Sequence, residues 1–286
     1  MKGSNTRPAV IPTLTPLTDH LGYEVQGIDI SMPLAPRLRE LLRGALATRG
    51  LLLFRGQELD EAQQIAFGRV FGELARQGPL QGISNDVTYV SNARKDGTFG
   101  DVELSFHSDQ AYFEFPMKAI LLYGVEVPSA GGETLFSSTV VACNAMDEDL
   151  IAQLRDRKVR NRFEYGRISL PHHLHQRLAD QVQEHWHPVV ATHVDSGQRI
   201  HMVNVDHSMQ LEGVDEGVSQ EIIRKVNAVM TRPEVIYRHR WSVGDLIVWD
   251  NTLLHHARTP FSSSERRTLR RCVIGHENEV PYTAAA

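Results

Sequence analysis

Two short His-x-Asp patterns are the first candidates for chemistry in this sequence. One is His107-Ser108-Asp109 and the other is His193-Val194-Asp195. In an extended segment, side chains two positions apart point to the same face, so either pair could bind one metal ion. A pair of this kind leaves an Fe(II) site short of a ligand. A second histidine from a distant strand would complete a face of two histidines and one carboxylate, and would leave the opposite positions open for O2.

The surroundings of the two patterns differ. Asp195-Ser196-Gly197 is typical of a turn, so we interpret Asp195 as a turn residue and His193 as the end of a strand. Isolated His-x-Asp patterns are more often structural than metal-binding, because satisfied histidines and turn aspartates are common. Other residues must therefore support a metal site at His107 and Asp109.

The third ligand could come from an adjacent pair far downstream, His255 and His256. Each is followed at the same spacing by an arginine, Arg266 or Arg267. Neighbouring residues on a strand face opposite ways, so only one of the two histidines can point at a metal ion. The spacing alone leaves the choice open.

Composition narrows the class of protein. The 286 residues carry a formal net charge of -5, and 41% of them are hydrophobic and 23% charged, as in ordinary soluble globular proteins. There is no long basic run and no apolar run of membrane-spanning length, so we expect neither nucleic acid nor membrane as a partner. Cys143 and Cys272 stand far apart, which indicates no disulfide framework. The N-terminus lacks the apolar segment of a signal peptide, and we expect a cytoplasmic protein that binds a small-molecule substrate.

The order of predicted elements favours one domain. We expect residues 1–10 to be a flexible tail and 11–286 a single domain, mainly β with flanking helices, because many short strands occur without regular alternation with helices. The polar segment 160–187 has no assignable pattern, and long inserts of this kind often cover an active site. Predicted strands lie within 11–30 and at 51–54, 87–90, 119–125, 189–193, 200–203, 246–249 and 269–274; predicted helices lie at 34–45, at 60–71 with Asp60 as N-cap, at 140–157, and at 219–230 with Ser219 as N-cap.

Taken in order, the motifs resemble the TauD/TfdA family of Fe(II)/2-oxoglutarate-dependent dioxygenases, which includes taurine dioxygenase and aryloxyalkanoate dioxygenases. The resemblance runs over nearly the whole chain and implies a double-stranded β-helix core, the jelly roll of cupin-like proteins. It also implies Fe(II) as cofactor, 2-oxoglutarate and O2 as cosubstrates, and a homodimer or homotetramer. The matching segments are 53–57, 71–74, 106–109, 128–136, 187–189, 248–261 and 266–271.

The resemblance assigns the iron ligands to His107, Asp109 and one of the two adjacent histidines. It favours His256, which falls at the family's ligand position counted from Trp249-Asp250-Asn251 and is followed by the family's usual residues, 257–261. It also assigns the distal carboxylate of 2-oxoglutarate to Arg267, assisted by the Thr134 hydroxyl. A guanidinium suits that role because it binds a carboxylate through two parallel hydrogen bonds.

The reaction that the resemblance implies is oxidative decarboxylation of 2-oxoglutarate coupled to hydroxylation of an unactivated C–H bond. A carboxylate at Asp109 fills the position that related halogenases leave open for chloride, so hydroxylation is favoured. The substrate is less constrained. Arg271, four residues beyond Arg267, implies an acidic substrate, while Glu103 would repel a sulfonate, which argues against taurine. Glu103 and His207 are further candidates for substrate contact.

Two other readings use some of the same residues. A zinc hydrolase could hold an activated water on His107, Asp109 and His256, although Arg267 and Gly131-Gly132-Glu133-Thr134 have no role in that scheme. The other alternative is a non-catalytic ligand-binding β-barrel of the same ancestry, against which the intact ligand and arginine positions argue.

Overall fold

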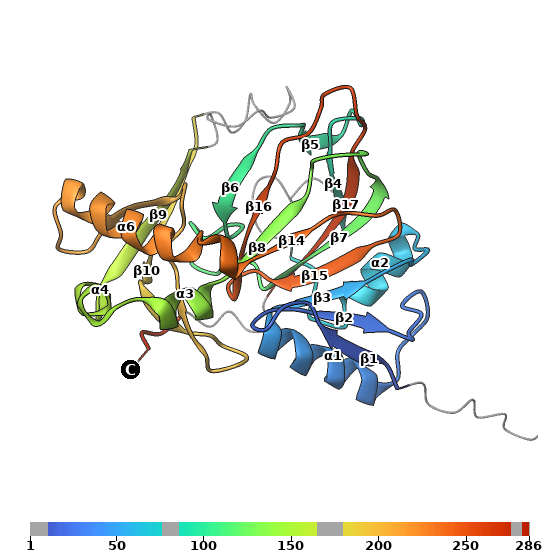
Figure 1. The fold of residues 1–286 in the computed structure, drawn as a ribbon, viewed down its shortest axis with the longest axis horizontal. Helices are drawn as coiled ribbons and strands as arrows, with labels where there is room; N and C mark the ends of the chain where they lie inside the picture. Colours follow the sequence, from blue (N-terminus) through green and yellow to red (C-terminus); the bar gives the residue numbers. More distant parts are fainter. Residues whose placement is uncertain (1–10, 76–85, 165–179, 276–281, 286) are drawn as a thin grey trace, which may run out of the picture.

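The computed structural model describes residues 11–75, 86–164, 180–275 and 282–285, so the predicted tail 1–10 lies outside it. Its largest element is an eight-stranded sheet (Figure 1). All neighbouring strands in this sheet run antiparallel except β2–β3 and β4–β5, which are parallel. In spatial order the strands are β1 (Thr13–Pro16), β2 (Tyr23–Gln26), β3 (Leu51–Phe54), β15 (Leu246–Asp250), β7 (Ala119–Glu126), β17 (Thr268–Ile274), β4 (Val87–Ser91) and β5 (Gly97–Phe99).

A smaller antiparallel sheet faces the large one and carries the candidate site. Its order is β14 (Ile236–His239), β8 (Thr134–Ser138), β16 (Leu254–Arg258) and β6 (Leu104–His107). A three-stranded sheet and a hairpin lie beyond it: β10 (Val182–Pro188), β9 (Lys158–Glu164) and β13 (Ser208–Leu211), and β11 (Val190–Thr192) with β12 (Arg199–His201). The unassigned segment 160–187 thus contains parts of β9 and β10, and its residues 165–179 lie outside the described part.

The apolar strands of the large sheet are buried on both faces. Leu51 and Leu53 of β3 pack into the core between the two sheets, while Leu52 and Phe54 pack against the helical side. Successive side chains alternate between faces, so a strand covered on both sides must be apolar throughout. That is why 51–54 was predictable from composition alone.

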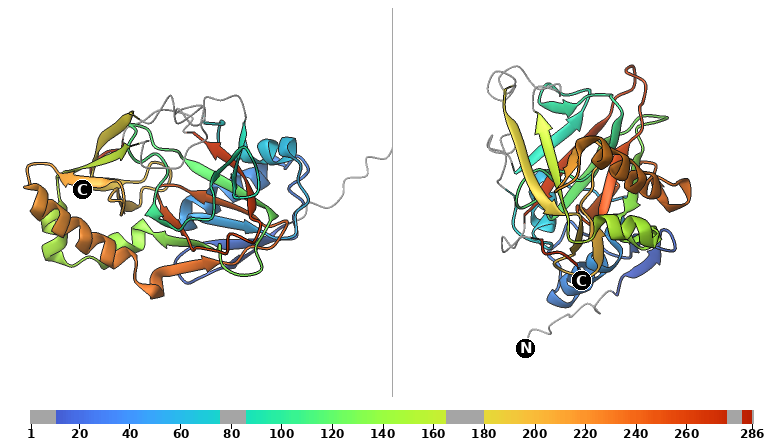
Figure 2. Two further views of the ribbon diagram at one scale, coloured as in Figure 1. Left: turned by 90° about the horizontal axis from the view of Figure 1, so that it is seen from above. Right: turned by 90° about the vertical axis from the view of Figure 1, so that its left-hand side faces the viewer.

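The helices occupy two places. α1 (Pro36–Arg49) and α2 (Glu61–Gly68) cover the outer face of the large sheet, with Asp60 capping α2 as predicted. Three further helices lie together at the other end of the molecule: α3 (Thr139–Ala145), α4 (Glu148–Leu154) and α6 (Glu216–Met230). The left view of Figure 2 shows α6 at the end of the molecule remote from α2. No described helix is long and apolar enough to cross a membrane.

Two helix predictions were wrong in detail. The helix expected over 140–157 is divided into α3 and α4, because Asp147 accepts a hydrogen bond from the backbone N–H of Leu150 and starts a new helix. The cap of α6 is Asp215 rather than Ser219. Ser219 is buried inside the helix, and its hydroxyl accepts the N–H of Leu211.

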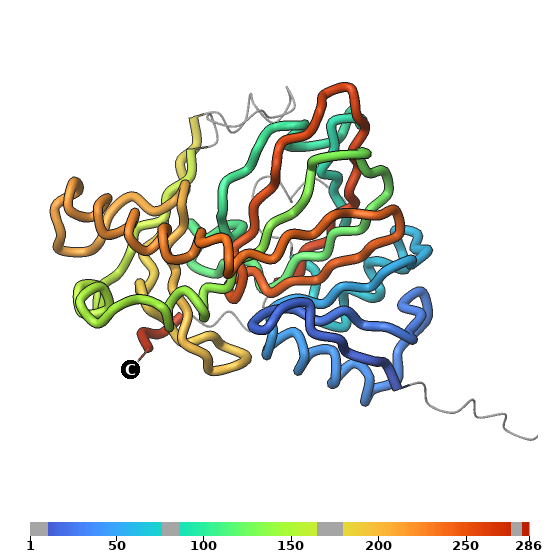
Figure 3. Tube along the Cα trace, in the orientation of Figure 1, coloured from blue at the N-terminus to red at the C-terminus, as the bar shows by residue number. Residues whose placement is uncertain are grey.

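The last described residues return to the body of the molecule. The Thr192 N–H donates to the carbonyl of Thr283, and the Ala285 N–H donates to that of Val190. Figure 3 shows this end of the chain beside the segment that contains β11 and β12. The mainly β architecture with flanking helices agrees with the fold class predicted from the sequence.

Candidate active site

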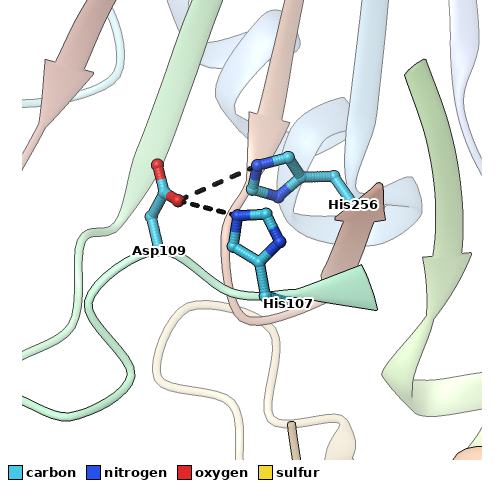
Figure 4. Close-up of side chains that lie close together, drawn as sticks. All are labelled: His107, Asp109 and His256. Carbon is cyan, nitrogen blue, oxygen red and sulfur yellow. Dashed lines mark ion pairs between the residues drawn. The ribbon is translucent and has the colours of Figure 1, made fainter. Parts of the chain in front are cut away.

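Three side chains, two from neighbouring strands and one from the turn that follows β6, meet at one point (Figure 4). β16 places His256 directly opposite His107, the last residue of β6. The Nε2 atoms of His107 and His256 lie 3.2 and 3.9 Å from the same oxygen, Oδ1 of Asp109. One donor atom from each residue lies within 4.8 Å of the others, and among the described residues no other three metal-binding side chains meet so closely.

The protonation of His107 fits a cation at this point. Its Nδ1 lies 2.7 Å from the carbonyl oxygen of Ser105. A carbonyl only accepts, so Nδ1 carries a proton and the neutral ring presents an unprotonated Nε2 to Asp109. A lone pair facing a carboxylate needs a cation between the two atoms, either a proton or a metal ion. Metal-binding histidines are commonly oriented by a hydrogen bond of this kind from the other ring nitrogen.

The electrostatics keep Asp109 ionised and His256 neutral. Burial raises the pKa of Asp109, but the charge of Arg271 and the contact with His107 outweigh burial, and the pKa lies well below its ordinary value. Burial and the nearby His107 lower the pKa of His256 to about 3. Burial also favours neutral His107, yet the hydrogen bond and charge of Asp109 raise its pKa. The ionised Asp109 and the neutral His256 are in the forms that bind metals, and a metal ion would take the place of the proton that Asp109 favours on His107.

His255 points away from this group. It is 1% exposed and its ring centroid lies 5.4 Å from that of His201 on β12. The strand geometry thus brings His256, and not His255, to His107 and Asp109. His255 is paired across the sheet with Ser137, while His256 is paired with Phe136.

The two candidate arginines also face opposite ways. Arg266 is exposed and pairs with Glu126, with Nε 3.1 Å from Oε1. Arg267 is 1% exposed, and its Nε donates to the carbonyl of Gly132 over 3.1 Å. Its buried Nη1 has no hydrogen-bond partner among the described residues. Burial and the neighbouring Arg258 lower the pKa of Arg267 to about 9. A buried guanidinium without a protein carboxylate favours an anionic ligand.

The Gly131-Gly132 pair lets the chain pass close to Arg267. Both residues have positive φ, +74° and +65°, where other side chains are strained. A Cβ on Gly131 would lie 2.6 Å from the carbonyl oxygen of Pro260, and one on Gly132 would lie 3.1 Å from Cδ of Arg267. The glycines therefore allow the carbonyl of Gly132 to hold the guanidinium.

Thr134 follows this turn and is 3% exposed. The indole Nε1 of Trp241 lies 2.9 Å from its hydroxyl oxygen. Indole can only donate, so the threonine oxygen accepts this bond and keeps its own proton to donate elsewhere. On the neighbouring strand Thr134 is paired with Arg258, whose guanidinium donates to the carbonyls of Phe99, Gly100 and Val102.

The three candidate substrate residues lie in different places. Arg271 is partly buried, and its Nη2 contacts Oδ2 of Asp109 and lies 3.7 Å from the sulfur of Met117. The ring centroid of His207 lies 6.1 Å from that of His107. Glu103 is exposed, and no hydrogen bond or ion pair joins it to the site residues within the described ranges.

Aromatic side chains that the sequence did not single out surround His207. Tyr112 and Phe163 stack with their centroids 4.7 Å apart, and the ring of His207 meets both edge-on at 5.3 and 5.5 Å. Phe163 lies on β9, within the polar segment 160–187. That segment has no assignable pattern, so the sequence did not single out Phe163. We call Tyr112, Phe163 and His207 the aromatic wall.

Comparison with known proteins identifies the family. The chain matches "Taurine catabolism dioxygenase TauD, TfdA family" over residues 13–273 and belongs to this family. It is 29% identical over 275 residues to the alpha-ketoglutarate-dependent 2,4-dichlorophenoxyacetate dioxygenase of Cupriavidus pinatubonensis, which covers 90% of this chain and 95% of that protein. It is 28% identical over 274 residues to the alpha-ketoglutarate-dependent sulfate ester dioxygenase of Pseudomonas putida, with coverage of 92% and 89%. The predicted enzyme class, a 2-oxoglutarate-dependent dioxygenase, is confirmed.

Solved structures share the fold. AAD-2, in complex with Mn(II) and N-oxalylglycine, matches with a TM-score of 0.80 and 24% identity, over 96% of this chain and all (100%) of that one. A taurine dioxygenase from Burkholderia xenovorans matches with a TM-score of 0.77 and 25% identity, over 94% and 92%. These matches confirm the predicted cupin-like fold class.

Proposed function

We propose that this dioxygenase uses Fe(II), 2-oxoglutarate and O2 to hydroxylate an unactivated C–H bond of a small organic acid. The observation that carries the proposal is the combination of two features, one at the small sheet and one just before β17 of the large sheet. His107, Asp109 and His256 converge as a metal-binding face, and Arg267 holds a buried guanidinium nitrogen without a partner among the described residues.

The side chains at the convergence point fit Fe(II). Two imidazoles and one carboxylate on one face are the set that non-haem Fe(II) oxygenases use, because the opposite positions stay open. The iron and the keto acid, when bound, supply the activation of O2, which no side chain can provide. The protein's own task is to fix the ligands, bind the keto acid and place the substrate.

Arg267 and Thr134 fit the distal carboxylate of 2-oxoglutarate. The guanidinium is fixed by Gly132 through Nε, which leaves buried Nη1 to donate. The hydroxyl of Thr134 has its acceptor side occupied by Trp241 and can donate as well. Two donors directed at one carboxylate would replace the hydration that the anion loses on binding.

For the substrate, we propose an organic acid with an aromatic group. Arg271 supplies a cation beside the metal-binding face, and the aromatic wall lies beside His107. A carboxylate on Arg271 and a ring against the wall would place the atoms between them near the ligands. Curated relatives named for 2,4-dichlorophenoxyacetate and (S)-phenoxypropionate act on acids of this type.

The test is a substrate panel scored by succinate release in the Fe(II)-loaded enzyme. It should contain aryloxy acids, sulfonates, alkyl sulfates and amino acids, with the oxidised product identified. We expect the highest kcat/KM with an aryloxy acid, and a raised KM for that acid in Arg271→Ala. Succinate release with none of these classes would contradict the proposal. Turnover retained with Zn(II) in place of iron would instead favour the hydrolase alternative.

A further inference from the structure

The sheet fixes the two histidines but not Asp109. The strand β6 ends at His107, where its pairing with His256 also ends. Asp109 lies two residues further on, and Gln110 after it has a φ of +57°, so the chain turns there. Without a strand neighbour, the direction of the Asp109 side chain needs another support.

Asn251 provides that support through its side-chain amide. Its Oδ1 accepts the backbone N–H of Asp109 over 2.9 Å, and its Nδ2 donates to the carbonyl of the same residue over 2.8 Å. The same nitrogen donates to the carbonyl of Met117 over 3.0 Å. Asn251 is fully buried, at 0% exposed, and the two carbonyls fix which end of the amide is the nitrogen.

These two hydrogen bonds bracket the Cα of Asp109. Its N–H and its carbonyl lie on either side of that atom, so holding both fixes the direction in which the side chain leaves the backbone. A second buried amide holds the preceding residue, because Oδ1 of Asn204 accepts the N–H of Ser108 over 2.7 Å. Asn204 is 1% exposed and its Nδ2 donates to Met202. The turn is thus hydrogen-bonded by side chains as a strand would be by a neighbour.

We propose that Asn251, assisted by Asn204, is a positioning residue that aims the Asp109 carboxylate at the metal. The proposal rests on the proposed function, in which Asp109 is a ligand. Asn251 contacts the backbone of Asp109 and would act on the metal only through that residue. Hydrogen-bond partners that orient metal ligands typically change metal affinity by about 10- to 100-fold when removed.

The chain contains a matched control in Asn92. Its Oδ1 accepts the backbone N–H of Arg267 over 2.9 Å, and its Nδ2 donates to the carbonyl of Glu265 over 2.8 Å. This is the same kind of amide-to-backbone contact, but on the arginine that would bind the keto acid. Loss of the Asn92 amide should therefore affect 2-oxoglutarate rather than metal.

The experiment measures Mn(II) affinity of the metal-free full-length protein, following free Mn(II) by electron paramagnetic resonance. We expect the dissociation constant to rise about 10- to 100-fold in Asn251→Ala and to stay within about 2-fold in Asn92→Ala. The dissociation constant for 2-oxoglutarate at saturating Mn(II) should rise in Asn92→Ala. Thermal unfolding of each metal-free variant checks that the protein is folded.

Asp109→Ala separates the two possible failures. If the wild type binds no Mn(II), or Asp109→Ala binds it as well as the wild type, the proposed function fails at this site. If Asp109→Ala loses Mn(II) while Asn251→Ala binds it normally, only the positioning role is overturned. Should Asn251→Ala not fold, Asn204→Ala decides: weaker Mn(II) binding supports the role, and unchanged binding overturns it.

Discussion

The segments 107–109 and 193–195 carry the same His-x-Asp pattern in different surroundings. At the second, both nitrogens of His193 have protein partners: Nε2 lies 3.1 Å from Oδ2 of Asp250 and Nδ1 lies 2.8 Å from the hydroxyl of Ser196. Asp195 lies in a turn and pairs with Lys118 over 2.9 Å. The predicted turn there is confirmed.

The first segment leaves its donor atoms facing one another. His107 uses Nδ1 on a backbone carbonyl, and its Nε2 faces Asp109 and His256. The difference arises from the neighbouring strand, because β16 brings a third ligand opposite His107. After Thr192, by contrast, the chain leaves its strand and His193 is buried against Asp250. The comparison teaches that the same pattern can offer a metal-binding face only where the fold adds a third donor and leaves the two Nε2 atoms facing one carboxylate oxygen.

The largest expected effect separates the two histidines by metal binding. His107→Ala removes a ligand, and we expect Fe(II) affinity to fall by more than about 100-fold, beyond the loss of an outer hydrogen-bond partner. Turnover should be lost with it. His193→Ala should leave Fe(II) affinity within about 3-fold of the wild type at a temperature where it is folded, since no ligand is removed. Equilibrium dialysis against Fe(II) under anaerobic conditions measures both, and equal losses would remove the distinction.

A smaller effect concerns Arg267, the buried arginine that we assign to 2-oxoglutarate. Arg267→Gln should raise the KM for 2-oxoglutarate by about 30- to 150-fold, because charge-assisted bonds contribute about 2–3 kcal/mol. Fe(II) affinity without 2-oxoglutarate should stay the same. The exposed neighbour provides the control, since Arg266→Gln should leave both quantities unchanged. An unchanged KM in Arg267→Gln would remove the assigned role.

The smallest effect is the pH dependence of stability at the second segment. Burial raises the pKa of Asp250, but the charge and hydrogen bond of His193 outweigh burial and lower the pKa to about 2. The same pair raises the pKa of His193, although burial opposes the rise. The aspartate's contribution is lost as the pH falls from about 4 towards 2, and that of the histidine as the pH rises above 6.5 through its raised pKa.

The pair should therefore stabilise the fold most between about pH 4 and 6.5. Urea unfolding of the wild type and of His193→Gln across this range measures the difference in unfolding free energy. We expect the wild type to be more stable by about 1.5 kcal/mol near pH 6, because the glutamine amide keeps a hydrogen-bond donor but loses the charge that pairs with Asp250. A difference that does not change with pH would show that the pair is not ionised.

The parts of the fold that the sequence predicted best were strands that contribute no residue to the candidate active site. The strands β3, β7 and β15 are apolar because both of their faces are buried, and each was predicted. β8 and β14 were missed, and β6 and β16 were expected only as extended segments around their histidines, because polar residues interrupt the apolar pattern of all four strands.

The residues of the candidate site also fall into two groups, those that the sequence indicated and those that it did not. Motif spacing and the family resemblance singled out the residues that converge, and the resemblance favoured His256 over its neighbour. Neither gave a signal for Asn251, whose contact with Asp109 spans 142 positions and depends on the folded chain. In the sequence, Asn251 served only as part of Trp249-Asp250-Asn251, the motif from which the position of His256 is counted. The aromatic wall was equally hidden, because Phe163 and His207 come together with Tyr112 only through β9 and the loop before β13.

The most direct test is the visible charge-transfer absorption of the protein mixed anaerobically with Fe(II) and 2-oxoglutarate. A keto acid chelated to Fe(II) gives such a weak band, and its formation needs both the metal-binding face and the cosubstrate. The account predicts the band in the wild type and in His193→Ala, and its loss in His107→Ala and His256→Ala. A wild type without the band, or a His107→Ala variant that keeps it, would contradict the account.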